Sequence, residues 1–219
     1  MSLSELWSLY GQNYIDALLA TWGMTLESFA IAMVLAVAVT VMRVSPLKPL
    51  RVFGDLYVQV FRNIPGIALL IIVVYALPPL KVVLPYRTCV IVATVLLGSA
   101  FGSENFMSGI NTVGVGQVEA ARSLGMSFSR ILAKIVIPQA LRSSVLPMTN
   151  LFIAVMLTTA LGSQVPLQPQ ELTGVVSYIN TRSLGGVAAF FISALGYLGT
   201  AFVVSHIGNY IDKKMRILR

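Results

Sequence analysis

Five stretches of apolar, almost uncharged residues follow one another along the chain, separated by short polar segments. They cover residues 22–42, 63–80, 88–106, 144–166 and 184–206. Each is close to the roughly 20 residues that a helix needs to cross the hydrocarbon core of a bilayer. Because lipid offers the backbone no hydrogen-bond partners, such segments fold as helices. The pattern predicts an all-α membrane protein, a single domain over residues 1–219 with about five transmembrane helices.

The second stretch is the least regular of the five, because Pro65, Pro78 and Pro79 interrupt it. Proline lacks a backbone donor and disturbs a helix wherever it stands in the interior. The helix that crosses the membrane here can therefore begin earlier, near Phe53.

Residues 1–20 precede the first stretch and carry no Lys or Arg. Without a basic region of this kind, we expect no signal peptide. Apolar side chains in this segment share related faces of a helix: Leu6, Leu9, Tyr10, Ala17 and Leu18. Helices of this type lie in the membrane interface with the apolar face toward the acyl chains. We therefore expect an outer amphipathic segment over residues 1–20.

The distribution of charge predicts the topology. Hydrophobic residues make up 57% of the chain and charged residues 11%, against roughly 25% in soluble domains. Eleven of the 15 Lys and Arg residues fall in three segments, 43–51, 122–142 and 213–219, which alternate with the apolar stretches. Since basic loops stay in the cytoplasm, the N-terminus is predicted outside and the C-terminus inside. The net charge of +7 thus reflects a lipid bilayer as the partner and no nucleic acid.

The largest basic segment lies in a polar loop, residues 115–138. Residues 115–124 can form a short helix, Gly125 can end it with positive φ, and Ser127 can cap a second helix. In that second helix the apolar residues recur with helical spacing: Phe128, Ile131, Leu132, Ile135 and Val136. Pro138 is expected to end or kink it. The sequence thus predicts a compact helix–turn–helix on the cytoplasmic side.

Several short motifs resemble those of one family of transport proteins. They are Phe61-Arg62-Asn63-Ile64-Pro65, Ala100-Phe101-Gly102-Ser103-Glu104, Gly116-Gln117-Val118-Glu119-Ala120-Ala121-Arg122-Ser123-Leu124-Gly125 and Ile137-Pro138-Gln139-Ala140. These elements are similar to those of the membrane permeases of ATP-binding-cassette (ABC) importers for polar amino acids, the histidine, glutamate and glutamine group. The loop at 115–138 resembles the EAA loop that marks these permeases.

The resemblance implies a type I ABC importer permease fold in a bacterial plasma membrane. ATP and Mg²⁺ would bind a dimer of separate ATPase subunits, so this chain would be no enzyme and would hold no cofactor or metal. The chain also lacks a Walker-type phosphate-binding run. A solute-binding protein outside the membrane would deliver the amino acid. The coupling residues implied are Gln117, Glu119, Ala120, Ala121, Arg122, Leu124, Gly125 and Pro138.

The substrate is less closely defined by the motifs. Residues 42–46 and 108–113 look particularly like glutamate-uptake permeases, which favours glutamate or glutamine. Two positions depart from the family pattern. Met107 stands where these permeases commonly have Arg, and the run that begins at Leu157 lacks the family's Lys. The missing cations leave open a pore-forming partner subunit without a substrate site of its own.

Polar side chains inside the apolar stretches are candidates for the translocation path, because lone charges in lipid are costly. Glu104 is the strongest candidate, since it interrupts a long uncharged run. Arg62 is either its ionic partner or an anchor that extends to the cytoplasmic interface, and we favour the anchor. Asn150, Thr158 and Thr159 either line the path or hydrogen-bond between helices.

Five spans enclose little volume, so the pore is expected between two permease subunits. We favour a heterodimer with a second, related permease over a homodimer, because the two missing cations suggest a division of labour. The alternative of another class is a channel or secondary transporter that needs no ATPase. Inverted repeats would support it, and none is evident in the sequence.

Overall fold

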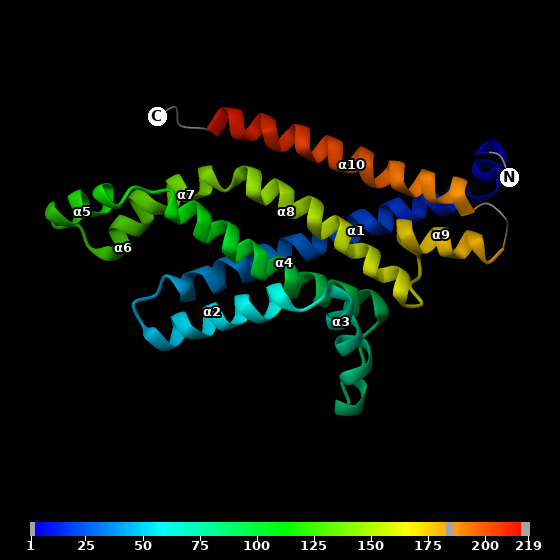
Figure 1. The fold of residues 1–219 in the computed structure, drawn as a ribbon, viewed down its shortest axis with the longest axis horizontal. Helices are drawn as coiled ribbons and strands as arrows, with labels where there is room; N and C mark the ends of the chain where they lie inside the picture. Colours follow the sequence, from blue (N-terminus) through cyan, green and yellow to red (C-terminus); the bar gives the residue numbers. More distant parts are fainter. Residues whose placement is uncertain (1–2, 183–185, 216–219) are drawn as a thin grey trace.

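The computed structural model describes residues 3–182 and 186–215, which form helices and, within these ranges, no strand (Figure 1). The helices are α1 (Leu3–Arg43), α2 (Lys48–Asn63), α3 (Gly66–Ile71), α4 (Tyr86–Asn111), α5 (Val115–Ser123), α6 (Phe128–Ile131), α7 (Ile137–Ser143), α8 (Val145–Thr158), α9 (Leu172–Asn180) and α10 (Gly186–Met215). Short π-helical turns cover Ile72–Ala76 and Leu132–Val136, and 3₁₀ turns cover Pro78–Leu80 and Thr159–Gln164. The all-α fold is confirmed.

Four helical segments are long and apolar enough to cross a membrane: α1, α4, α10 and Val145–Gln164, which joins α8 to the 3₁₀ turn. The second predicted span, 63–80, is wrong as a single helix. Here α2 ends at Asn63, and the chain bends by 103° before it continues over Gly66–Leu80. The cause is Pro65, which disfavours helical geometry at the residue before it, so that Ile64 is extended (φ −83°, ψ 131°).

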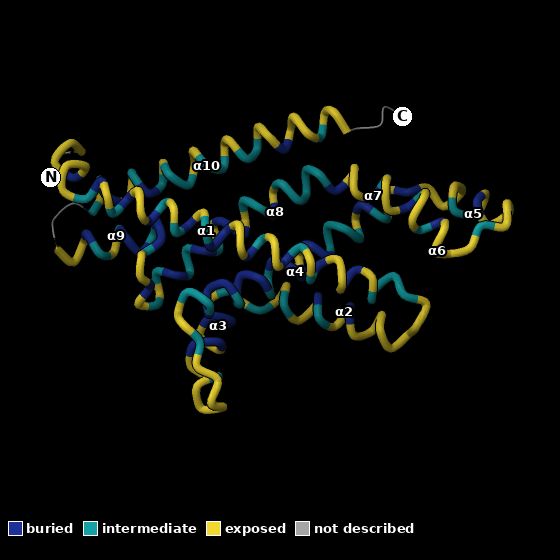
Figure 2. The backbone as a smooth tube through the Cα atoms, turned by 180° about the vertical axis from the view of Figure 1, so that it is seen from behind, coloured by how far each residue is buried: buried dark blue, intermediate teal, exposed yellow. Residues whose placement is uncertain are grey.

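Residues 66–85, named here the α3 arm, project away from the body of the molecule (Figure 1). The end of the arm is exposed, as Figure 2 shows, and Leu80 and Val83 are 71% and 77% accessible. Apolar side chains at this level of exposure are covered in the membrane by lipid or by another protein.

The most extensive helix contact is that of α1 with α4, and small residues lie in it. A Cβ placed on Gly98 would lie 3.2 Å from the Ala32 Cβ, and one placed on Gly102 would lie 2.8 Å from the Ala36 Cβ. Gly98 and Gly102 are four residues apart on α4, as Ala32 and Ala36 are on α1. Small residues at this spacing let membrane helices approach closely. Toward the beginning of α4, Arg87 and Glu27 form a bidentate ion pair at 2.6 and 2.8 Å.

The first 20 residues differ from the expected interfacial segment. From Leu3 onward they are the beginning of α1, not a separate helix. Leu6, Tyr14 and Ala17 are buried against α9 and the start of α10. Of the predicted apolar face, Leu6 and Ala17 meet protein because the short helix α9, which the sequence did not predict, covers them, whereas Leu9 is exposed.

A buried carboxylate, Glu171, holds α9 in place. Its side chain accepts hydrogen bonds from the backbone N–H groups of Thr173 and Gly174, both at 2.6 Å, and from the Tyr197 hydroxyl of α10 at 2.9 Å. These bonds cap α9 and tie it to α10. Burial raises the pKa of the Glu171 carboxyl above its usual range.

Candidate coupling loop and translocation cleft

The loop 115–138 forms the helix–turn–helix that its sequence predicts. Helix α5 ends in a Schellman turn: Gly125 N–H donates to the Arg122 carbonyl at 2.9 Å, and Met126 N–H donates to the Ala121 carbonyl at 3.1 Å. Gly125 adopts φ +74°, as expected. Ser127 stands at the N-cap of α6, although its side chain makes no capping hydrogen bond.

Pro138 was expected to end or kink the second helix, and the first of these two alternatives is wrong, because the helix continues past it. Helix α6 continues through the π-helical turn Leu132–Val136 into α7, where Pro138 occupies the first turn. A proline lacks the N–H that would bond four residues back, and a widened turn is one way in which a helix accommodates it.

The loop has a packed inner side and an exposed outer side. Val113, Ala121, Ile131 and Val136 form its small buried core. Gln117 is exposed, and its Oε1 accepts a hydrogen bond from Gln139 Nε2 at 2.6 Å, which ties α5 to α7. The other residues assigned to coupling are exposed: Glu119, Ala120, Arg122, Leu124, Gly125 and Pro138.

Large apolar side chains are also exposed around this turn. Val115, Leu124 and Phe128 are 71%, 83% and 53% accessible, although the loop lies outside the apolar spans. Phe128 was expected on the buried face and lies outside it. An exposed apolar patch with a polar rim, on a loop braced by its own core, is typical of a protein docking site.

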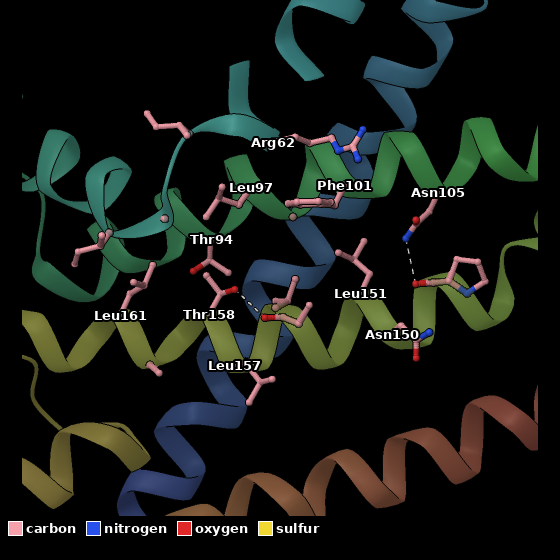
Figure 3. Close-up of a pocket in the computed structure, with 18 of the residues that line it drawn as sticks. Arg62, Thr94, Leu97, Phe101, Asn105, Asn150, Leu151, Leu157, Thr158 and Leu161 are labelled. Carbon is pink, nitrogen blue, oxygen red and sulfur yellow. Dashed lines mark hydrogen bonds between the residues drawn. The ribbon is translucent and has the colours of Figure 1, made fainter. Parts of the chain in front are cut away.

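An open cleft of about 1030 Å³ lies between the α2–α3 region, α4 and α8 (Figure 3). Most of its walls are apolar, with Leu97, Phe101 and Leu161 among the side chains that line it. Its polar lining side chains are Arg62, Thr94, Asn105, Asn150, Thr158 and Gln164. Asn150 and Thr158 thus face the cleft, as one reading of the sequence expected.

Thr159 does not line the cleft. It is fully buried and its hydroxyl donates to the Met156 carbonyl at 2.6 Å, so it stabilises the turn after α8. Thr94 was not singled out from the sequence, yet it lines the cleft with a buried hydroxyl that has no hydrogen-bond partner among the described residues. Buried polar atoms of this kind are normally satisfied by water or a ligand.

Beside the cleft, Glu104 lies between two guanidinium groups. Its Oε2 is 3.2 Å from Arg43 Nη1 and 3.3 Å from Arg62 Nη1. Arg62 also lies over the Phe101 ring, with its Cζ 5.3 Å from the centroid. Arg62 is therefore an ionic partner of Glu104, the alternative that the sequence favoured less, and its role as an interface anchor stays a prediction.

Arg43 is a further member of this cluster that was not predicted, because in the sequence it belongs to a basic segment that indicates only the orientation in the membrane. Its Nε pairs with Asp55 Oδ1 at 2.9 Å, and its Nη1 donates to Ser103 Oγ at 3.2 Å. The result is a row of alternating charges, Asp55, Arg43, Glu104 and Arg62, that joins α1, α2 and α4. Among residues 3–182 and 186–215, no group of three His, Cys, Asp or Glu side chains can hold a metal ion.

Comparison with known proteins gives a consistent result. Residues 28–217 match the family described as binding-protein-dependent transport system inner membrane component. A glutamate transport system permease of Corynebacterium efficiens is 33% identical and aligns over 90% of this chain and 91% of its own. Two permeases of Bacillus subtilis are each 31% identical: one for L-cystine (95% and 91% covered) and a probable glutamine ABC permease (97% and 96%).

Solved structures agree in fold. A chain of an amino acid ABC transporter with histidines superposes with a TM-score of 0.91 at 24% identity, over 98% of this chain and 99% of that one. A chain of the MetNI methionine ABC transporter, in an inward-facing conformation, superposes with a TM-score of 0.73 at 18% identity, over 99% and 100%. The arrangement of helices is thus that of type I importer permeases.

Proposed function

The chain belongs to the family of binding-protein-dependent transport system inner membrane components, and we propose that it imports glutamate or glutamine with energy from a separate pair of ATPase subunits. As an amino acid ABC importer permease it is a membrane subunit and not itself the ATPase. The observation that carries the proposal is the braced loop with exposed Glu119, Arg122 and Leu124, at the same end of the molecule as the α1–α2 connection and the end of α10 (Figure 1).

Coupling through this loop follows from its build. The core of Val113, Ala121, Ile131 and Val136 and the Gln117–Gln139 hydrogen bond make the loop move as a unit. An ATPase that binds the exposed side of α5 can therefore transmit its closure to α4 and α7–α8, which the loop connects. A change of this kind between two packed arrangements is typical of switching by domain motion.

The lining of the cleft supports the class of substrate. It offers one cation, Arg62, with the amides of Asn105, Asn150 and Gln164, and no carboxylate among the described lining residues. A carboxylate of the amino acid can bond to a guanidinium, and an amide side chain to amides and hydroxyls. A cationic side chain finds no counter-ion in the lining, which disfavours basic amino acids.

The cleft is open, so a single chain does not enclose a solute. We propose that a second, related permease completes the pore, with the α3 arm as part of the contact, and that the pair is a heterodimer. Leu157, where the family has a run with a Lys, lines the cleft with an apolar side chain and favours a second candidate: a pore-forming subunit whose partner supplies the charged substrate contacts.

Orientation is part of the proposal. The α1–α2 connection, the α5–α7 loop and the end of α10 lie at one end of the molecule, and the N-terminal part of α1 and α9 lie at the other (Figure 1). Because the first group contains the basic segments, we propose that it faces the cytoplasm and that a solute-binding protein docks at the other end.

The proposal is tested by reconstitution of the chain with its ATPase, its binding protein and a candidate second permease in liposomes. We expect ATP-dependent uptake of labelled glutamate or glutamine, stimulated by the binding protein, and little uptake of arginine. Uptake without ATP would establish a channel or secondary transporter instead. Full activity with this chain and the ATPase alone, without the second permease, would show that it forms the whole pore as a homodimer.

A further inference from the structure

A groove runs along α10 on the side that faces α1 and α8, away from the translocation cleft. It consists of two hollows of about 310 and 330 Å³. Phe152 and Val204 line both, so the two lie next to each other along the helix. We call this the α10 groove. Contacts hold α10 at two levels along it: Trp22 Nε1 donates to Thr200 Oγ1 at 3.1 Å, and Gly208 packs directly on Thr149.

The chemistry of the lining calls for an apolar occupant. No Asp, Glu, Lys, Arg or His lines either hollow. The three threonine hydroxyls present all donate to carbonyls four residues back in their own helices: Thr25 to Thr21, Thr149 to Val145, and Thr200 to Gly196, at 2.7–2.9 Å. Since these donors are satisfied, a polar solute would lose its hydration and gain little in return.

The length of the groove fits a hydrocarbon chain. The groove follows α10 from Gly199 to Ile211, which is about 18 Å at 1.5 Å per residue. One leaflet of a bilayer is about 15 Å of hydrocarbon, half of the whole core.

Basic side chains mark one end of the groove. Lys214 lies three residues beyond Ile211 and seven beyond Ile207, on the helix face that lines the groove. Arg142 lies three residues before Val145 and seven before Thr149. Because α7 runs almost directly into α8, Arg142 stands on the helix face that lines the groove.

Other charges and aromatic groups stand at this end too. Lys213 adds a cation and Asp212 an anion. The Lys214 Nζ is 4.6 Å from the centre of the Tyr210 ring, an aromatic residue of the kind that marks the headgroup level of a membrane.

We propose that the α10 groove binds an anionic phospholipid, with an acyl chain in the two hollows and the headgroup phosphate between Arg142 and Lys214. Basic sites between helices at the membrane surface bind anionic headgroups in this way. A zwitterionic lipid would fill the same hollows but would bring its own cation next to these two. The site is independent of the transported substrate and of the proposed coupling.

The test measures lipid retention. The permease complex is equilibrated in nanodiscs of equimolar phosphatidylglycerol and phosphatidylcholine with matched chains, extracted, and analysed by native mass spectrometry. We expect preferential retention of phosphatidylglycerol. Arg142→Gln with Lys214→Gln should lower that preference about tenfold or more, given the contribution of each cation near a charged headgroup. Val204→Trp, which fills the point shared by the hollows, should reduce retention of both lipids.

The matched control is Lys48→Gln with Arg51→Gln, which removes two cations at the same end of the molecule but away from the groove; retention should stay at the wild-type level. Equal retention of the two lipids by the wild-type protein would overturn the proposal, as would a double variant that keeps the wild-type preference. A control variant that loses the preference equally would assign it to the general surface charge.

Discussion

Replacing Glu104 with glutamine removes the one negative charge between Arg43 and Arg62 while it keeps the size of the side chain. At about 3.2 Å and an effective dielectric constant of about 20, each ion pair is worth about 5 kcal/mol before desolvation. Most of this is offset by lost hydration, and Glu104 and Arg62 remain 39% and 36% exposed, which screens their pair. Arg43, only 11% exposed, keeps Asp55 as a partner. We therefore expect a net destabilisation of about 2 kcal/mol.

The assay has two readouts. Thermal unfolding of the purified complex should shift downward by about 5 °C for Glu104→Gln. Uptake in proteoliposomes should fall by about tenfold, more than the stability loss explains, because Arg62 loses the partner that holds it beside the cleft. Expression in the membrane should change little.

A matched control is available at the other ion pair. Glu27→Gln breaks the bidentate contact with Arg87 at 2.6 Å, but this pair is 49% and 42% exposed and does not line the cleft. It should cost about 0.5–1 kcal/mol and leave uptake intact. If Glu104→Gln behaves like Glu27→Gln in both readouts, the reasoning about the charge row is wrong.

Three further predictions concern the loop, α10 and α9. Gly125→Val places a β-branched residue at φ +74°, so ATP hydrolysis should lose its dependence on substrate while Gly125→Asn retains it; equal coupling ratios would contradict the docking role. Gly208→Ala drives a Cβ into Thr149 and should lower the melting temperature, whereas Gly199→Ala, which points into open space, should be neutral or raise it slightly. Burial raises the pKa of Glu171, so the folded state keeps this proton when the unfolded state has lost it, and stability should fall as pH rises from about 4. A melting temperature that follows the same pH profile in Glu171→Gln as in the wild type would show that Glu171 is not responsible.

The coupling loop was predictable because its determinants are local. A glycine after a short helix, followed by an apolar face at helical spacing, sets its own geometry whatever surrounds it. The error at Pro138 has a local origin as well. A proline within the first turn of a helix is tolerated, and no residue pattern before Pro138 indicates the π-helical turn that continues the helix into it.

Two helices, α2 and α9, were not predicted correctly, because of the composition of the first and the length of the second. Helix α2 begins at Lys48, inside a segment that its charges marked as a loop, and it passes through Arg62 before Pro65 breaks the span. Helix α9 has only nine residues and so carries a weak periodic signal. Glu171 caps it, but Glu is not one of the residues that ordinarily mark an N-cap, so it was no signal for the start of a helix.

The charge row could not be derived from sequence. Arg43 and Glu104 come from different spans, and only the packing of α1 on α4 brings them together. Arg43 ends a helix in a basic segment, so the topology rule already explained its presence. Its ion pair with Glu104 was therefore not considered.

The α1–α4 pair has a consequence for how motion is distributed. Glu27 pairs with Arg87 and Arg43 pairs with Glu104, in the same order along both helices, so the two helices run parallel and are tied at two levels. The ties are about 24 Å apart on α1, and the Gly98–Ala32 and Gly102–Ala36 contacts lie between them. Sliding one helix along the other would break both ion pairs at once and separate these contacts. We therefore expect α1 and α4 to move together as one rigid unit, the frame of the subunit. Spin labels placed on α1 and α4 should therefore report one distance in every nucleotide state, and the widening or narrowing of the cleft must come from α8 and the α3 arm, which are held to that frame at fewer points.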